Sequence, residues 1–471
     1  MSLQFVLSNK GHPLLKHEGY LFRKYQKSTV RTYWRCTQFD SSKCRGTAIT
    51  SDGNVIKHSD HHNHVPDVAA VEAKEVMAKI KEIATNCQES TNNVLAIGTA
   101  NVASSVSGKL PTVSLIKRTI QRKRQRYNHA PANPATLSHL IIAEEYSLTE
   151  INEQFLLYDS GSKDPQRFII FATQNSLRRL SNSNHWFADG TFKTCPQLFA
   201  QLYTIHSIQY NDVLPSVFVL MSDMSQNGYS RVFEELKCHQ DNLRPQSILT
   251  DFELSAVNAF QMSFPNSEHR GCFFHFSQNI WRRINEFPQI RERYISETEF
   301  AHNLKKLVCL AFVPVNDVET AFEQLMDTAF FTDNEQLLAD LMDYFENNYI
   351  GHLLRQRRRP PRYAISLWNC YNAVVNGIPK TNNNIEGWHR RLSSLIGASH
   401  PTIWKFINAL KKEESLVRFK LDQYAAGLPQ PQQSKIYRDC AERIQSCVNQ
   451  YDNSNILEYL NTLSHNINLN V

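Results

Sequence analysis

"HWFADGTFKTCPQLFAQLYTIHSIQYNDVLPSVFVLMS", residues 185–222, is the stretch that decides the fold. It contains three apolar runs, at 185–192, 198–209 and 213–222, joined by short polar connections. Runs of this length that are rich in Val, Ile, Leu, Phe and Tyr predict hairpin-connected β-strands. A helical stretch (227–240) and a fourth apolar run, "QSILTDFE" (246–253), follow. Strands, helix, strand and helix in this order predict an α/β fold whose sheet is at least partly parallel.

Composition divides the rest of the chain, which has 471 residues in all. Residues 1–66 are rich in Tyr, Phe, Cys and His and predict a small β-rich domain. Residues 67–136 read as a helical basic region that ends in a Pro-containing linker. The α/β unit occupies 137–425 and becomes almost wholly helical after about 278, and a helical tail (426–471) follows the break "AAGLPQPQQ".

Charge points to a polyanionic partner through its distribution, because the net charge is only +6. "KRTIQRKRQR" (117–126) holds six cations and "RQRRRPPR" (355–362) holds five. Such clusters are typical of phosphate-binding surfaces, although one run alone is more typical of a solvated helix face or loop, or of a nuclear-import signal. The candidate DNA-binding residues of the first run are Lys117, Arg118, Arg122, Lys123, Arg124 and Arg126.

The expected location is intracellular and reducing. The ten cysteines show no regular spacing, the first residues lack the apolar core of a signal peptide, and no stretch is long and apolar enough to span a membrane. In that setting, cysteines near histidines favour a metal site over a disulfide.

Two aspartates end predicted strands of the α/β unit. Asp189 closes "HWFAD" and Asp251 closes "SILTD". The carboxyl ends of strands are where α/β folds bind ligands, and two neighbouring carboxylates select a hard divalent cation such as Mg²⁺ or Mn²⁺. The alternative is a helix cap or a turn, and Glu253 is a second possible ligand.

Two cysteines and two histidines near the amino terminus form another candidate ligand set, namely Cys36, Cys44, His62 and His64. Zinc binds four thiolate and imidazole groups in a tetrahedron, and a His-x-His pair on an extended strand points both rings to one side. His58 and His61 crowd the same segment, so chemistry alone leaves the ligand choice open. The alternative interpretation, without a metal, is two buried cysteines beside a polar histidine loop.

"GYLFRKYQKSTVRTYWRCTQFDSSKCRGTAITSDGNVIKHSDHHNH" (19–64) resembles the FLYWCH-type zinc finger. The matching features are the Tyr20-Leu21-Phe22 strand, Tyr33-Trp34-x-Cys36, Cys44 and the closing His62-x-His64. The resemblance covers about residues 5–66. It implies Cys36, Cys44, His62 and His64 as structural zinc ligands, and a module that binds DNA or protein.

The stretches 187–237, 248–284 and 380–392 ("KTNNNIEGWHRRL") resemble the Mutator-like element (MULE) transposase domain. The resemblance spans about 185–425 and implies an RNase H-like catalytic core interrupted by a helical insertion at about 280–375. It also implies a D-D-E triad of Asp189, Asp251 and Glu386 that uses Mg²⁺ or Mn²⁺. Lys380 stands where the family more often has arginine, which keeps the positive charge.

"GCFFHF" contains a Cys-x-x-His at Cys272 and His275, which MULE domains carry in this place. On a regular strand the two residues would face opposite sides, so they could act together only across a bend or at a helix start. We expect them to support the site. The three asparagines before Glu386 predict a helix start capped by Asn383 or Asn384, with Trp388 and His389 packing or contacting DNA beside it.

The sequence thus predicts a nuclear DNA transposase, or a transposase-derived protein, that works on DNA as a homo-oligomer during strand transfer and needs no membrane. Strand cleavage and joining would proceed by two-metal phosphoryl transfer at the triad. The first alternative is a domesticated, non-catalytic regulator that binds specific DNA sequences. The second is a protein-interaction module built from the finger and the helical insertion.

Overall fold

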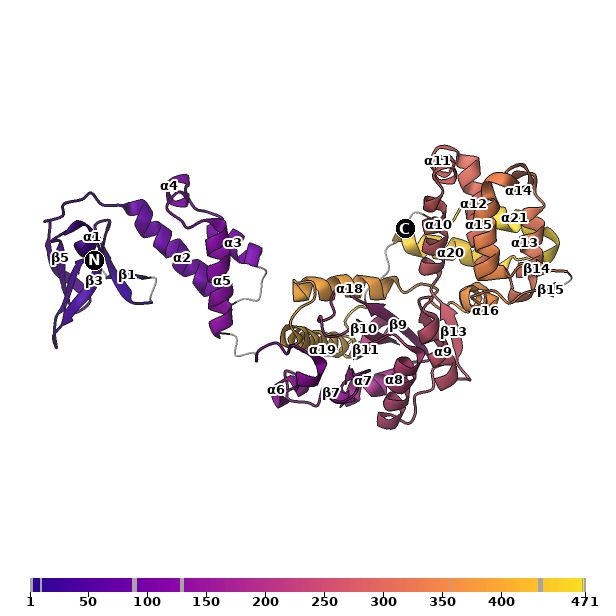
Figure 1. The fold of residues 1–471 in the computed structure, drawn as a ribbon, viewed down its shortest axis with the longest axis horizontal. Helices are drawn as coiled ribbons and strands as arrows, with labels where there is room; N and C mark the ends of the chain where they lie inside the picture. The colour runs from indigo at the N-terminus through magenta and orange to yellow at the C-terminus, as the bar shows by residue number, and fades with distance from the viewer. Residues whose placement is uncertain are drawn as a thin grey trace. The chain divides into compact units, whose positions relative to one another are not determined.

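The computed structural model describes residues 3–8, 11–86, 91–127, 131–355, 357–430, 435–467 and 469. The chain separates into two compact units, Met1–Pro131 and Ala132–Val471 (Figure 1). The larger unit mixes helices with a seven-stranded sheet, and the smaller begins with a β-rich domain, which confirms the predicted α/β class at this level. None of the described helices is long and apolar enough to cross a membrane.

The amino-terminal unit opens with a six-stranded antiparallel sheet whose strands follow chain order. Its strands are β1 (Gln4–Leu7), β2 (Pro13–His17), β3 (Tyr20–Lys27), β4 (Thr32–Cys36), β5 (Thr47–Ser51) and β6 (Asn54–Ser59), with the short helix α1 (Phe39–Ser42) between β4 and β5. The sheet curls into a half-barrel, since His17 on β2 meets His58 on β6 with ring centroids 5.0 Å apart. Phe22 and Trp34 fill its small core.

Four helices complete this unit: α2 (Val68–Asn86), α3 (Thr91–Thr99), α4 (Ser104–Ser107) and α5 (Val113–Tyr127). The basic helix α5 is amphipathic, with Ile116 and Ile120 buried against Ile80 and Ala84 of α2. Four-residue spacing places the two isoleucines on one face, so the cations between them point away from the contact.

The larger unit is organised around a seven-stranded sheet in the order β13-β12-β9-β10-β11-β8-β7. Its strands are β7 (Leu156–Asp159), β8 (Phe168–Phe171), β9 (His185–Thr191), β10 (Gln201–Gln209), β11 (Asp212–Met221), β12 (Ser247–Thr250) and β13 (Glu268–Gly271). β9, β10 and β11 form the predicted antiparallel hairpins. β12 lies parallel to both β9 and β13, as the strand–helix–strand pattern indicated.

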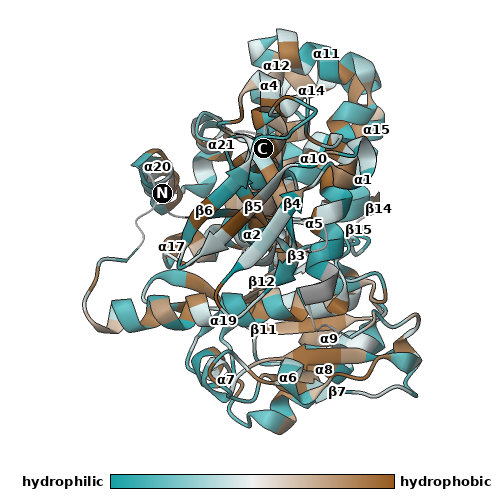
Figure 2. Cartoon of the chain, turned by 90° about the vertical axis from the view of Figure 1, so that its left-hand side faces the viewer, coloured by the Kyte–Doolittle hydropathy of each residue, from teal (hydrophilic) through white to brown (hydrophobic). Residues whose placement is uncertain are grey.

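Helices cover both faces of this sheet, because its strands are apolar on both sides (Figure 1). Val217 and Val219 of β11 face one cluster that also contains Phe233, and the intervening Phe218 faces Trp388 on the other side. In Figure 2 the strand β11 is mostly brown, whereas α15 and α19 alternate between teal and brown, as amphipathic helices do. The helices around the sheet are α6 (Glu144–Ser147), α7 (Gln174–Ser181), α8 (Gln226–His239), α9 (Leu254–Ser263), α18 (Asn383–Ile396) and α19 (Ile403–Ala425), with the 3₁₀ turn η1 (Leu137–His139) before them.

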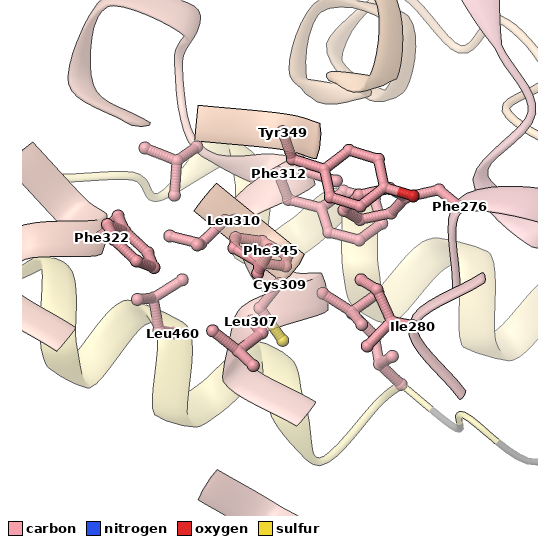
Figure 3. Close-up of a cluster of buried hydrophobic side chains, with 14 of the residues drawn as sticks. Phe276, Ile280, Leu307, Cys309, Leu310, Phe312, Phe322, Phe345, Tyr349 and Leu460 are labelled. Atoms are coloured by element: carbon pink, nitrogen blue, oxygen red, sulfur yellow. The ribbon is translucent and has the colours of Figure 1, made fainter. Parts of the chain in front are cut away.

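A helical module separates α9 from α18. It contains α10 (Phe273–Glu286), α11 (Pro288–Ser296), α12 (Thr298–Cys309), α13 (Val318–Met326), α14 (Ala329–Asp333), α15 (Glu335–Phe345), α16 (Ile365–Trp368) and α17 (Tyr371–Val375), the short turns η2 (Leu310–Phe312), η3 (Val315–Asp317) and η4 (Glu346–Ile350), and the hairpin strands β14 (Leu353–Leu354) and β15 (Arg357–Arg358). Figure 3 shows part of its core, where Phe276, Phe312, Phe345, Tyr349 and Leu310 belong to one buried cluster.

The carboxyl-terminal helices belong to the same core as the helical module. They are α20 (Lys435–Asn449) and α21 (Ile456–Ser464), joined by η5 (Asn453–Asn455). Leu460 and Val448 are fully buried in the cluster that contains Phe276, and Figure 3 shows Leu460 beside Phe322. The tail, which composition marked off as a separate segment, therefore completes the module instead of standing apart from it.

Candidate active site and candidate zinc site

The sheet register brings Asp189 and Asp251 level with each other. β12 runs parallel to β9, with Leu249 opposite Phe187, and the same offset carried two residues further sets Asp251 opposite Asp189. Neighbouring strands lie about 4.8 Å apart, so the two carboxylates share one edge of the sheet. Asp189 is only 5% exposed.

The negative charges of the two aspartates repel each other when both carboxylates are ionised. Burial, with the nearby charges of Asp251 and Glu386 adding to the rise and His275 opposing it, raises the pKa of Asp189 to about 8. Burial also raises the pKa of Asp251, and His275 again opposes the shift. A buried carboxylate pair of this kind ionises fully only when a cation lies beside it.

Glu386 reaches the same edge from helix α18. Alternation along β9 puts Phe187 and Asp189 on one face, and Phe187 packs there against Ile385, the neighbour of Glu386. Oε1 of Glu386 lies 3.6 Å from Nε2 of His275, which comes from the first turn of α10. His275 lowers the pKa of Glu386. Burial would depress the pKa of His275, but Cys272 and Glu386 outweigh it and raise that pKa to about 10, so the pair is ionic.

Cys272 and Asn382 fasten the starts of α10 and α18 to each other. The thiol of Cys272 donates to Oδ1 of Asn382 over 2.9 Å, and the backbone N–H of Asn382 donates back to Sγ over 3.3 Å. The N–H of Phe273 also donates to the carbonyl of Lys380 at 2.9 Å. We call these three bonds the latch. It holds the first turns that carry His275 and Glu386 together.

The latch corrects the expected role of the asparagines. We expected Asn383 or Asn384 to cap the helix, but α18 begins at Asn383, the preceding Asn382 is the cap position, and its side chain makes no capping bond. That side chain bonds Cys272 instead, and it is 1% exposed. The Cys-x-x-His lies at a helix start, which is one of the two arrangements in which the sequence allowed its members to act together.

Trp388 and His389 are buried, so they pack beside the carboxylates. The indole N–H of Trp388 donates to Oε1 of Glu413 over 2.6 Å. Nδ1 of His389 lies 3.4 Å from Oδ2 of Asp189. Burial lowers the pKa of His389 to about 4, so its ring is neutral at physiological pH and can donate Nδ1–H to the aspartate.

A neighbouring carboxylate has a different set of contacts. Oε2 of Glu253 accepts a 2.8 Å hydrogen bond from the hydroxyl of Tyr229. Burial raises the pKa of Glu253 to about 7, with Asp251 adding to the rise and Tyr229 opposing it. Tyr203 lies near the same charges, and burial raises its pKa. Sequence reasoning named Glu253 only as an alternative ligand and missed both tyrosines, which gave no signal beyond apolar strand and helix patterns.

The carboxylates match a divalent cation in donor chemistry. Hard oxygen donors select Mg²⁺ or Mn²⁺, and the pKa of Asp189 is raised by burial first and by neighbouring negative charge second, both of which a bound cation would offset. Among the described His, Cys, Asp and Glu residues, ligand atoms converge within 4.8 Å in two groups, and both lie in the amino-terminal unit. The three carboxylates do not converge to that extent, since Glu386 is turned to His275.

The first of those groups is Cys36, Cys44, His62 and His64. Sγ of Cys36 lies 3.3 Å from Nε2 of His64, and Sγ of Cys44 lies 3.3 Å from Nδ1 of His62. A tetrahedral zinc ion separates its sulfur and nitrogen ligands by roughly 3.6 Å, so the four atoms fit one. His58 bonds Asp60 and Glu18 instead, in the second group, His17, Glu18 and His58.

The surroundings of the four ligands also suit zinc. Burial raises the pKa of the Cys36 thiol to about 11, so a cation is needed to hold the thiolate at neutral pH. The backbone N–H groups of Gln38 and Gly46 point at Sγ of Cys36 and Cys44 at 3.5 and 3.4 Å. A Cβ on Gly46 would lie 2.2 Å from the His62 ring, so only glycine allows this approach.

The six candidate cations of α5 are not equally free. Arg118 and Arg122 are exposed, and Lys117 is partly exposed. Arg124 donates through Nε to the carbonyl of Ala84, and Lys123 is also engaged. The side chain of Arg126 lies outside the described residues. This helix thus presents a shorter basic stripe than its sequence implied.

Comparisons with known proteins confirm both resemblances. Family models match the FLYWCH zinc finger domain at residues 5–64 and the MULE transposase domain at 185–279. The FLYWCH-type zinc finger-containing protein 1 of Homo sapiens is 37% identical over 71 residues, and that of Mus musculus is 32% identical over 72. Each match covers 15% of this chain, which therefore spans about a tenth of the length of these curated relatives. A solved structure, "Drosophila P element transposase strand transfer complex", aligns over 72% of this chain and 90% of its own at 10% identity and a TM-score of 0.24.

Proposed function

We propose that this chain, which carries a FLYWCH zinc finger domain and a MULE transposase domain, is a nuclear DNA transposase. Its finger and basic segments would bind DNA, and it would act as a homo-oligomer during strand transfer. The observation that supports the proposal most is the register of β9 and β12, which sets Asp251 level with Asp189, together with the charge of Glu386, which is near enough to raise the pKa of Asp189. The strand order supports an RNase H-like core: three antiparallel strands, then two parallel strands on the side of the first.

In this proposal Asp189, Asp251 and Glu386 hold two divalent ions, Mg²⁺ or Mn²⁺. When bound there, such ions would activate a water or a 3′ hydroxyl and stabilise the leaving oxygen of the phosphodiester. The neutral ring of His389 orients Asp189 through Nδ1. The latch fixes where α18 begins and so where Glu386 lies, and His275 lowers the pKa of that carboxylate. In the amino-terminal unit, Cys36, Cys44, His62 and His64 would hold a structural zinc ion.

Cleavage of DNA tests the proposal. The purified chain, with duplex DNA taken from the flanks of its gene, should cut strands only when Mg²⁺ or Mn²⁺ is present. Asp189→Asn and Glu386→Gln should each abolish cutting, whereas Asp241→Asn, an exposed aspartate of the same unit, should leave it unchanged. Cutting that survives Asp189→Asn would refute the mechanism. Loss in Glu253→Gln with activity retained in Glu386→Gln would move the third ligand to Glu253.

One observation favours the second candidate, a regulator that binds DNA without cutting it. Glu386 is paired with His275, and the three carboxylates do not converge as a ligand group. In that case the protein would bind a specific DNA sequence, cut nothing with either ion, and lie at a locus without inverted repeats.

A further inference from the structure

A basic hairpin extends from the helical module. β14 and β15 pair antiparallel, with Leu353 opposite Arg358 and Leu354 opposite Arg357. Residues 353–362, which we call the arm, carry five arginines: Arg355, Arg357, Arg358, Arg359 and Arg362. Arg358 is nearly buried and the other four are exposed. Because side chains alternate along a strand, Arg357 and Arg359 point to the side opposite Arg358.

The inward arginine anchors the arm. The guanidinium of Arg358 lies 3.0 Å from Glu323 and 3.7 Å from Glu346, and it donates to the carbonyl of Gly351 over 2.7 Å. The N–H of Arg359 donates to the carbonyl of His352 at 2.9 Å. Gly351 has φ +91°, and a Cβ there would overlap the carbonyl oxygen of Arg359. The base of the arm is therefore fixed.

The outward arginines of the arm differ from Arg358 in their contacts. Within the described part of the chain, Arg355, Arg357, Arg359 and Arg362 form no ion pair, because the nearby glutamates are engaged by Arg358. Leu353 and Leu354 are 57% and 55% exposed beside them. Exposed guanidinium groups clustered on an arm with an anchored base suit phosphate, which they bind through two parallel N–H donors.

The arm is joined to the carboxylate site by aromatic packing. The ring of Tyr363, the residue after the arm, lies 5.0 Å from that of Phe252, which directly follows Asp251. Arg362 stacks over Tyr363 at 5.5 Å. Tyr363 also lies 5.8 Å from Tyr349 in the module core. The carboxyl-terminal end of the arm is thus held against the residue that follows Asp251.

We propose that the arm is a DNA-binding element that holds phosphates of the duplex next to the scissile bond. This inference rests on the proposed function for its substrate, and on the arm's own charge and anchoring for its site. It assigns the cationic cluster of 355–362 a position in catalysis: the arm binds sequence-independent backbone groups, while the carboxylates act on one phosphodiester.

Binding of DNA at different salt concentrations tests the arm. The test variant is Arg355→Gln, Arg357→Gln and Arg359→Gln together, which leaves Arg358 in place. The control removes three exposed arginines elsewhere in the same unit, Arg282→Gln, Arg291→Gln and Arg438→Gln. Both full-length proteins are titrated with a gene-flanking duplex and a scrambled duplex of equal length.

The test variant should bind both duplexes more weakly by the same factor. Three lost phosphate contacts lower the slope of log K against log salt by about 2.7, so its affinity deficit should shrink about 40-fold between roughly 50 and 200 mM salt. In cleavage assays KM should rise while kcat stays near that of the parent. Parental affinity and salt slope in the test variant would overturn the proposal and favour an acidic protein as the ligand of the arm. Equal losses in the control would overturn it as well.

Failure of the arm and failure of the proposed function are distinguishable. If the parent binds DNA but cuts none, the binding comparison still decides the arm. If the parent cuts DNA and the test variant binds like the parent, the triad stands and the arm is refuted.

Discussion

Replacement of Cys272 tests the latch that sets the position of Glu386. Cys272→Ala removes the thiol that donates to Oδ1 of Asn382 and accepts from its N–H, and both residues are at most 1% exposed. Each buried group left without a partner costs about 1–3 kcal/mol, with thiol bonds at the weak end. We therefore expect a loss of about 2–4 kcal/mol in the free energy of unfolding. Cys272→Ser keeps a donor and an acceptor and should lose less than Cys272→Ala.

Cys309 provides the matched control. It is also fully buried, but it lies in the apolar module core, where its thiol makes no hydrogen bond to any described residue. There a serine hydroxyl would be unpaired, so Cys309→Ser should be less stable than Cys309→Ala by about 1–3 kcal/mol.

The assay is urea unfolding of the full chain followed by tryptophan fluorescence. Five of the six tryptophans lie beyond residue 131, so the signal reports mainly on the larger unit. We expect the free energy of unfolding to be higher for Cys272→Ser than for Cys272→Ala, and higher for Cys309→Ala than for Cys309→Ser. The same order at both positions would refute the latch as a hydrogen-bonded contact.

Three further predictions concern the zinc site, the carboxylate pair and the packing of α18. Chelation of zinc, or Cys44→Ser, should unfold residues 1–66 and expose them to proteolysis while residues 132–471 stay intact. The reason is that structural zinc supplies about 10–16 kcal/mol of folding free energy. A finger that resists protease after chelation would contradict the ligand assignment. In EDTA, the raised pKa of Asp189 means that the folded state loses stability relative to the unfolded chain as pH rises from about 4 to about 8. Asp189→Asn should therefore be more stable than the parent at pH 8, with a difference in melting temperature that vanishes toward pH 4; a difference independent of pH would exclude the titration. Trp388→Phe should cost about 1.5–3 kcal/mol because it removes the donor to the buried carboxylate of Glu413; if calorimetry finds that Glu413→Gln restores none of this loss, the hydrogen bond is not its cause.

Local patterns predicted the part of the site that rests on adjacent strands. Asp189 and Asp251 each end an apolar run, and parallel pairing of those runs is sufficient to bring the carboxylates together. The four-residue strands β8 and β13 were missed because "FIIF" and "EHRG" are too short to show a period. The sequence predicted the helices of the tail but not where they pack, since only tertiary packing puts Leu460 in the module core.

The latch could not be predicted from the sequence either, because it also depends on tertiary packing. Asn382 lies 110 residues from Cys272 and stands in a run of asparagines whose local reading is a helix cap. Propensity describes what a residue does for its own segment, whereas this side chain serves another helix. The Cys-x-x-His motif was the one sequence feature that pointed to this contact, since its two residues could act together only at a bend or a helix start.

The latch also explains how a long interval can separate Asp251 from Glu386 without loosening the site. The module leaves the sheet at Phe273 and returns at Lys380, and the backbones of these two residues are hydrogen-bonded at 2.9 Å. Its two ends are therefore closed at one point, with Cys272 and Asn382 bonded beside it. The closure entropy of such an insertion grows only with the logarithm of its length. Helices can then be added between 273 and 380 while the first turn of α18, and with it Glu386, keeps its place against Phe187 and Asp189. On this reasoning the helical module is free to acquire its own contacts, such as those of the basic arm, because the geometry of the carboxylates is set at the base of the insertion.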